Sequence, residues 1–188
     1  VEDLWSEPHN VARKASEIKS RLHPTSLRGR TLLALALQPP QVSSSMSIRA
    51  FHGITPRLAA GVYVDPAAQV IGDVEIGEDT SIWPCAVVRG DVHSIRIGAR
   101  TSIQDGAILH VTHDGPYTPG GTPLLVGADV TVGHGVILHA CTVADACLIG
   151  MHATLMDGVV VQAHAIIAAG AVVTPGKQVG EGELWLGN

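Results

Sequence analysis

The sequence predicts an all-β fold, a parallel β-helix in the form of a triangular prism, and three observations point to it. Branched aliphatic residues recur every six positions over most of residues 64–179. Hydrophobic residues make up 46% of the 188 residues but aromatic residues only 3%, and glycine occurs 21 times. A period of six fits neither an amphipathic helix nor an alternating strand. It fits a chain that turns a corner every six residues, so that three sides make one coil of about 18 residues and coils stack roughly 4.8 Å apart.

Two sets of positions are expected to fill the prism. The inward-facing positions are all Val, Ile or Leu: Val64, Val70, Ile76, Ile82, Val88, Ile97, Ile103, Leu109, Val126, Val132, Leu138, Val143, Ile149, Leu155, Val161, Ile167, Val173 and Val179. Two residues before them, small or β-branched residues prevail. Cys141 and Cys147 fall in this second set, so we expect buried small side chains there rather than reactive thiols or metal ligands.

Residues 1–45 differ in composition from the rest of the chain. They carry a net charge of +2 and end in a Pro- and Ser-rich stretch at 39–45, whereas residues 46–188 carry −7. We expect 1–45 to form a short helical or irregular extension, to which we assign no role, and 46–188 to form one β-helix domain. A net charge of −7 offers no basic surface for nucleic acid. No run of about 18 apolar residues is present that could span a membrane.

The six-residue count is interrupted at three places. The step from Val88 to Ile97 is three residues too long, and the step from Leu138 to Val143 is one residue too short. The third interruption, after Leu109, adds eleven residues and includes the Gly- and Pro-rich stretch 113–121. We expect this stretch to project as a loop from the rigid prism, which is where proteins commonly carry function.

Three histidines stand at positions that suggest a metal site. Leu109 and Leu138 are three sides apart once the added loop is removed, so they lie on adjacent coils. His110 and His139 each follow by one residue and therefore point outward, about 4.8 Å apart, close enough to share one metal ion at 2.0–2.1 Å from each nitrogen. His134 stands two residues after Val132, on the preceding side of the prism. It therefore reaches the same point only from a neighbouring subunit. The spacing predicts a site between subunits of a symmetric oligomer, with three histidines and an open fourth position.

The segments around these histidines resemble the gamma-class carbonic anhydrase family. They are WP at 83–84, VRGDVH at 88–93, TSIQDG at 101–106, LHVTH at 109–113 and VGHGVILH at 132–139. The resemblance runs from about residue 54 to 188 and is strongest to the compact bacterial branch. It implies a left-handed β-helix that assembles as a homotrimer, with zinc, or alternatively iron, at each subunit boundary. It also implies a C-terminal family helix beyond residue 188, which this sequence does not contain.

The resemblance assigns roles to individual residues. His110 and His139 would come from one subunit and His134 from the next. Arg89 and Asp91 match positions that form ion pairs across the trimer contact. Gln104 matches a residue that hydrogen-bonds near the metal-bound solvent, and Asp105 matches a neighbour that supports it.

The implied reaction is the reversible hydration of CO2 to bicarbonate by a metal-bound hydroxide. Its proton must then leave, and the acidic residues that archetypal members use are replaced here by Val92 and His113. We take His113 as the candidate proton carrier.

Two other functions stay open, a non-catalytic metal-binding or scaffold protein and a hexapeptide acyltransferase. The three cysteines include no C-x-x-C pair and favour a reducing compartment. We expect a bacterial cytoplasmic location. The basic residues between 13 and 30 leave an organellar one open.

Overall fold

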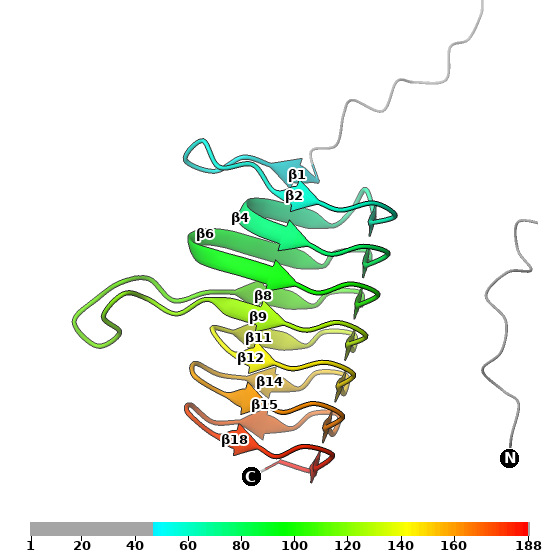
Figure 1. Ribbon diagram of the computed structural model, residues 1–188, viewed down its shortest axis with the longest axis vertical. Coiled ribbons are helices and arrows are strands. Elements are labelled where there is room, and N and C mark those ends of the chain that lie inside the picture. The colour runs from blue at the N-terminus through cyan, green and yellow to red at the C-terminus, as the bar shows by residue number, and fades with distance from the viewer. Residues whose placement is uncertain (1–46, 188) are drawn as a thin grey trace, which may run out of the picture. The chain divides into compact units, whose positions relative to one another are not determined.

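The computed structural model describes residues 47–187, which form a parallel β-solenoid of about eight turns (Figure 1). This part of the chain consists of turns and strands, most of which have two or three residues, and contains no helix. Among the same residues, consequently, no helix is long and apolar enough to cross a membrane. The extension expected over 1–45 lies outside the described residues.

The strands stack into three faces, and every ladder between named strands is parallel. Face 1 consists of β1 (Ile48–Arg49), the first parts of β4 (Gln69–Ile76) and β6 (Val87–Ile97), β8 (Ile108–His110), β11 (Ile137–His139), β14 (Thr154–Leu155) and β17 (Val172–Val173). Face 2 consists of β2 (Arg57–Leu58), the second parts of β4 and β6, β9 (Leu124–Val126), β12 (Thr142–Val143), β15 (Val160–Val161) and β18 (Gln178–Val179). Because β4 and β6 run through the corner between them, faces 1 and 2 form one 12-stranded sheet.

Face 3 is a separate sheet of seven strands. It consists of β3 (Tyr63–Val64), β5 (Ser81–Ile82), β7 (Ser102–Ile103), β10 (Thr131–Val132), β13 (Leu148–Ile149), β16 (Ile166–Ile167) and β19 (Leu184–Trp185). The chain thus visits face 3, face 1 and face 2 in turn on each full coil, which confirms the triangular prism predicted from the period of six.

The core is the one that the sequence predicts. All the six-residue positions from Val70 to Val179 are buried, and Val64, on the first coil, is half-buried against them. Thr80 and Thr101 occupy the smaller set of inward positions and are also buried. Their hydroxyls donate to the carbonyls of Gly98, at 2.8 Å, and Gly127, at 2.9 Å, so burial leaves no polar group unpaired at these two positions.

The two insertions leave the prism at the edge between faces 1 and 2. Gly72 pairs with Gly90 and Val74 with Ile95, so residues 91–94 bulge out opposite Asp73. The longer insertion, which we call the excursion (112–122), closes through two backbone hydrogen bonds between Thr112 and Thr122, of 3.1 and 2.9 Å. It projects from the prism, as predicted (Figure 1).

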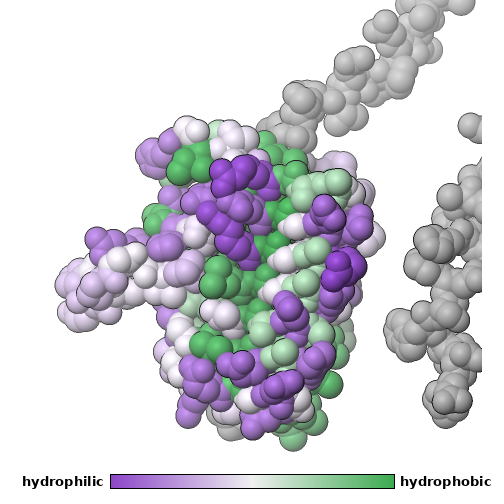
Figure 2. Space-filling view, in the orientation of Figure 1, coloured by the Kyte–Doolittle hydropathy of each residue, from purple (hydrophilic) through white to green (hydrophobic). Residues whose placement is uncertain are grey.

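The outward-facing rows differ from face to face. On face 2, the row begins with Arg57, Glu75 and Arg96, and Figure 2 shows hydrophilic residues gathered over these first coils. On face 1, the row runs Gln69, Val87, Ile108, Ile137, Thr154 and Val172, so it is apolar over the coils that carry His110 and His139.

Candidate metal centre

His110 and His139 lie directly opposite each other at the ends of β8 and β11, on the outer side of face 1. Leu109 and Leu138, one residue earlier, are fully buried, so the alternation of the strands turns both imidazoles outward. Nδ1 of His110 lies 3.2 Å from Nε2 of His139. The structure therefore brings together the two histidines that the sequence paired; that they bind a metal stays a prediction.

A carboxylate flanks the histidine pair on each side along the solenoid axis. Oδ1 of Asp91, in the bulge after the first part of β6, lies 2.9 Å from Nε2 of His110. Oδ1 of Asp157, just after β14, lies 2.6 Å from Nδ1 of His139. Four side chains on consecutive coils thus form one ladder, carboxylate–imidazole–imidazole–carboxylate.

Both carboxylates are held in their ionised form. Burial raises the pKa of Asp91, but the hydrogen bond from His110 and the guanidinium of Arg89 outweigh it, so the pKa lies below its ordinary value. Burial acts on Asp157 in the same direction. There the hydrogen bonds from the Thr112 hydroxyl and from His139 outweigh it and again lower the pKa.

His134 lies at the opposite edge of face 1, in the turn between β10 and β11. Its Nδ1 lies 2.9 Å from Oδ2 of Asp105, which sits on the same corner one coil earlier. The turn at 134–135 and the strand β11 separate His134 from His139, which lies at the far end of that strand. Within residues 47–187, no group of three His, Cys, Asp or Glu side chains could hold one metal ion.

The donor atoms fit a zinc-type ion. Two nitrogen ligands of one tetrahedral zinc, each at 2.0–2.1 Å, are about 3.3 Å apart, and the facing nitrogens of His110 and His139 are 3.2 Å apart. A carboxylate on the far nitrogen of a ligating imidazole is the usual support in such sites. Asp157 provides it for His139 and Asp105 for His134.

The other predicted site residues are spread over both edges of face 1. Arg89 donates to Asp91 within the chain, so the ion pair that the resemblance puts across a subunit contact already exists inside one subunit. Gln104 is half-buried beside Asp105 on the His134 corner. His113 is exposed on the excursion. The interface role of the first pair and the catalytic roles of the other two stay predictions.

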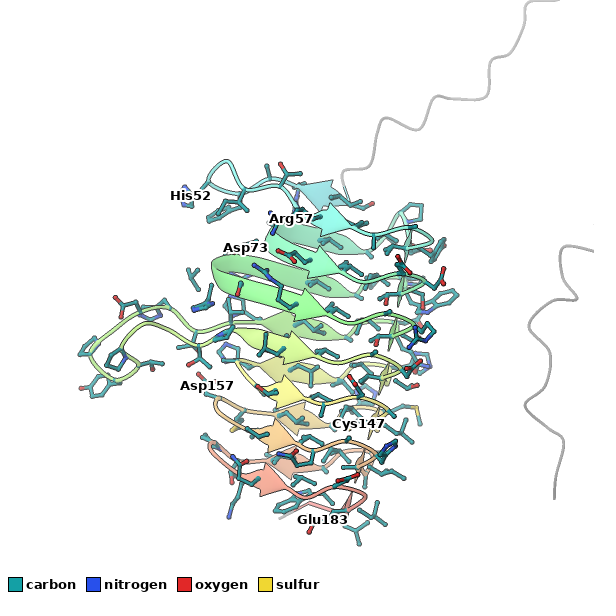
Figure 3. The ribbon with its side chains drawn as sticks, viewed as in Figure 1. His52, Arg57, Asp73, Cys147, Asp157 and Glu183 are labelled. Carbon is teal, nitrogen blue, oxygen red and sulfur yellow. The ribbon has the colours of Figure 1, made fainter. Side chains whose placement is uncertain are left out.

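The sequence reasoning missed Asp157 and Thr112. The Thr112 hydroxyl donates to Oδ2 of Asp157, whose Oδ1 meets His139. Asp157 stands at the edge of the prism from which the excursion projects (Figure 3). One signal was present: Leu155 is in register with Leu138, so Asp157 stands one coil further on, one residue past the position in register with His139.

Comparison with known proteins places the chain first in a class and then in a family. Residues 55–90 match the family model "Bacterial transferase hexapeptide (six repeats)". Protein YrdA of Escherichia coli is 47% identical over 141 residues, covering 75% of this chain and 77% of its own length. "Gamma carbonic anhydrase 2, mitochondrial" of Arabidopsis thaliana is 46% identical over 134 residues. The match covers 71% of this chain but only 48% of the plant protein, so the chain spans about half of that relative.

A solved structure of a hexapeptide transferase family protein from Anaplasma phagocytophilum has a TM-score of 0.66 and 39% identity, covering 73% of this chain and 77% of that one. The fold and these matches define a hexapeptide-repeat β-solenoid. Within that class, the chain belongs to the gamma-class carbonic anhydrase family. One relative is bacterial and another mitochondrial, so the compartment expected from the sequence stays a prediction.

Proposed function

We propose that this chain catalyses the metal-dependent, reversible hydration of CO2 at sites between the subunits of a homotrimer. The observation that carries the proposal is the division of the three histidines over face 1. His110 and His139 stand together at one edge, at the separation that one ion requires, while His134 stands at the other edge with its own carboxylate. A second copy that brings its His134 edge to this edge completes the set.

The surface between the two edges supports such a contact. Ile108 and Ile137 are 46% and 38% exposed and lie side by side, each two residues before a histidine of the pair. Val87 continues the row on the preceding coil. An apolar row next to the ligands is what a subunit contact would bury, because its transfer from water stabilises association.

The chain's own side chains have distinct tasks in this reaction. His110, His139 and His134 of a neighbouring subunit would hold the ion, which, when bound by three neutral imidazoles, supplies Lewis-acid activation of water near neutral pH. Asp105 and Asp157 hold the far nitrogens of two of these imidazoles. We assign Gln104 to hydrogen bonding at the open side of the site. The exposed imidazole of His113 accepts the proton that accompanies bicarbonate formation and passes it to solvent.

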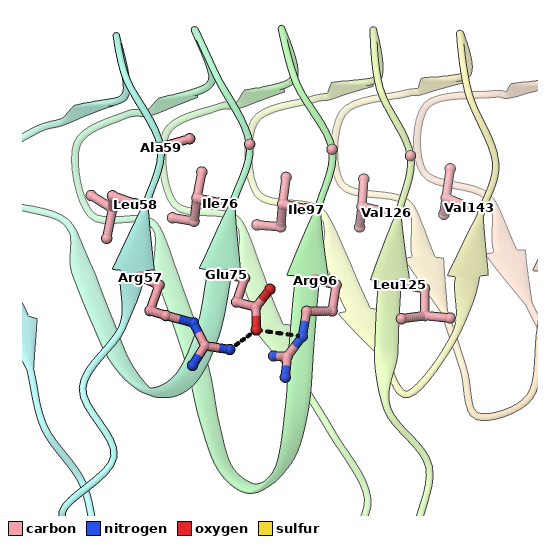
Figure 4. Close-up of a pocket in the computed structure, with 13 residues that line it drawn as sticks. Arg57, Leu58, Ala59, Glu75, Ile76, Arg96, Ile97, Leu125, Val126 and Val143 are labelled. Carbon is pink, nitrogen blue, oxygen red and sulfur yellow. Dashed lines mark hydrogen bonds and ion pairs between the residues drawn. The ribbon is translucent and has the colours of Figure 1, made fainter.

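An acyltransferase would need a groove able to hold the phosphates of a large nucleotide-containing ligand. Face 2 carries an open groove of about 680 Å³ that includes Arg57 and Arg96 (Figure 4). Both guanidiniums, however, are paired with Glu75, and Arg96 also with Asp73, at 2.8 Å. Because these carboxylates neutralise the arginines, the groove disfavours a phosphate-bearing ligand.

The test is metal content per chain on anaerobically purified protein, followed by stopped-flow CO2 hydration on the same sample. We expect about one zinc or iron per chain, since each boundary of a trimer holds one site, and hydration that is lost on chelation. Metal without hydration would favour the non-catalytic binding protein. Protein that takes up no metal after incubation with zinc would contradict the proposal.

A further inference from the structure

We propose that Asp157 and Thr112 are positioning residues that hold His139 in the orientation and tautomer needed to bind metal, and so tie the excursion to the metal site. The inference rests on the proposed function for its metal. Asp157 lies outside the family motifs, and Thr112 lies within one of them but has no role assigned by it.

The two carboxylate oxygens of Asp157 have different partners. Oδ1 lies 2.6 Å from Nδ1 of His139, and Oδ2 accepts the hydroxyl proton of Thr112. An ionised carboxylate can only accept hydrogen bonds, so it keeps the ring proton of His139 on Nδ1. Nε2, which faces His110, is then left with a free lone pair.

The hydrogen bond from Thr112 fixes the carboxylate itself. Without a partner on Oδ2, the carboxylate could rotate about its own bond and lose its alignment with the imidazole. Asp157 is only partly buried, with 42% of its side chain exposed, so packing alone does not hold it. The hydroxyl therefore supplies a constraint that the surrounding side chains do not.

Thr112 is also the first residue of the excursion. Its backbone forms the two hydrogen bonds with Thr122 that close the neck of the loop. The neck of the excursion, Asp157 and His139 are therefore joined by consecutive hydrogen bonds. A change in the neck is expected to reach the metal ligand through Asp157, although no excursion residue is itself a ligand.

The experiment compares zinc affinity, by chelator competition, in the full chain and in Asp157→Ala, Thr112→Val and Thr112→Ser. Loss of an outer hydrogen-bond partner of a metal-binding histidine typically weakens affinity about 10- to 100-fold. We expect a loss of this size for Asp157→Ala, a smaller loss for Thr112→Val, and near-normal affinity for Thr112→Ser, which keeps the hydroxyl. Glu181→Gln is the control, because it removes one exposed carboxylate from the turn between β18 and β19, which is not the edge that carries the histidine pair.

A second readout needs no metal. In metal-free protein, ¹⁵N NMR of the histidine rings reports which nitrogen of His139 carries the proton. We expect Nδ1 in the parent and in Thr112→Ser, and a shift toward Nε2 in Asp157→Ala. If the parent binds no zinc, the proposed function fails, while the NMR result still decides the positioning. An unchanged tautomer in Asp157→Ala, or unchanged zinc affinity in a folded Asp157→Ala protein, would overturn it.

Discussion

Nδ1 of His110 faces Nε2 of His139 at 3.2 Å across two adjacent coils, while His134 stands at the other edge of the same face. The backbone repeat alone produces this pairing, since Leu109 and Leu138, one residue before the two histidines, are paired in register. One chain therefore supplies two ligands at the separation for one ion and cannot supply the third. This relationship makes the assembly of subunits part of the proposed chemistry.

The first prediction uses mixed assemblies. His110→Ala and His134→Ala chains should each bind no zinc alone, because every boundary then lacks one ligand. After unfolding and refolding together in equal amounts, a boundary that takes its pair from a His134→Ala chain and its third ligand from a His110→Ala chain is complete. Random mixing into trimers makes roughly one quarter of the boundaries complete. Zinc per chain, measured after gel filtration, checks this.

The matched control for that experiment mixes His110→Ala with His139→Ala chains. Both substitutions damage the same half of the site, so no boundary regains three histidines and zinc should stay absent. Zinc recovered in this control would show that the pair is not contributed by one subunit.

The second prediction concerns the surface that subunits share. Ile108→Glu places a charge in the apolar row of face 1, and we expect a folded monomer without bound zinc, since burying an unpaired carboxylate is costly. Ile166→Glu makes the same change on face 3, where Ile166 is 42% exposed against 46% for Ile108. This variant should remain a trimer. Molar mass by sedimentation equilibrium distinguishes the two, and dissociation of the face 3 variant alone would move the interface to face 3.

The period of six was sufficient to predict the prism and the stacking of His110 on His139. It determines which residues face inward and how many separate two points on adjacent coils, and the ladder between β8 and β11 has that register. The same count also located both insertions, because a rigid repeat can absorb extra residues only at its corners.

The contacts made at those corners could not be predicted. Asp157 and Thr112 lie in a turn and at the neck of the excursion, where no repeat specifies the direction of a side chain. Likewise, Arg89 could pair across a subunit contact or within the chain, and only the rotamers decide that it reaches Asp91. Periodicity determines the backbone phase, whereas these contacts depend on side-chain torsions.

The third prediction separates the three thiols. Burial raises the pKa of Cys141 to about 12 and also raises that of Cys147, whereas Cys85 is exposed. Because the thiolate is the reacting form, a thiol reagent at pH 8 should modify Cys85 rapidly and the two buried thiols only after denaturation. Mass spectrometry of timed samples checks this. In Cys85→Ser the rapid phase should vanish, and its persistence would mean that the solenoid opens at Cys141 or Cys147.

Burial of the Cys141 thiol also makes the free energy of unfolding depend on pH. The folded state keeps this thiol protonated to a higher pH than the unfolded chain does. The stabilisation from the buried, protonated thiol is therefore fully present below the ordinary thiol pKa. It declines as the pH rises from that value toward about 12. Urea midpoints measured from pH 7 to 10 should fall more steeply in the parent than in Cys141→Ala, which has no thiol to ionise. Equal slopes would contradict a buried, protonated thiol.

The last prediction compares two glycines on the corner that carries His134. Gly106 and Gly135 both have positive φ, 69° and 66°, so alanine at either costs about 1–2 kcal/mol through the backbone. A Cβ on Gly106 would meet nothing within 4 Å, whereas one on Gly135 would overlap the ring of His152. Gly135→Ala should therefore lower the urea midpoint more than Gly106→Ala, and should weaken zinc binding because it moves the turn next to His134. Adding His152→Ala to Gly135→Ala should remove the extra decrease in the urea midpoint, since the overlapping ring is gone. If the double variant stays as unstable as Gly135→Ala, the extra cost does not come from overlap with the His152 ring.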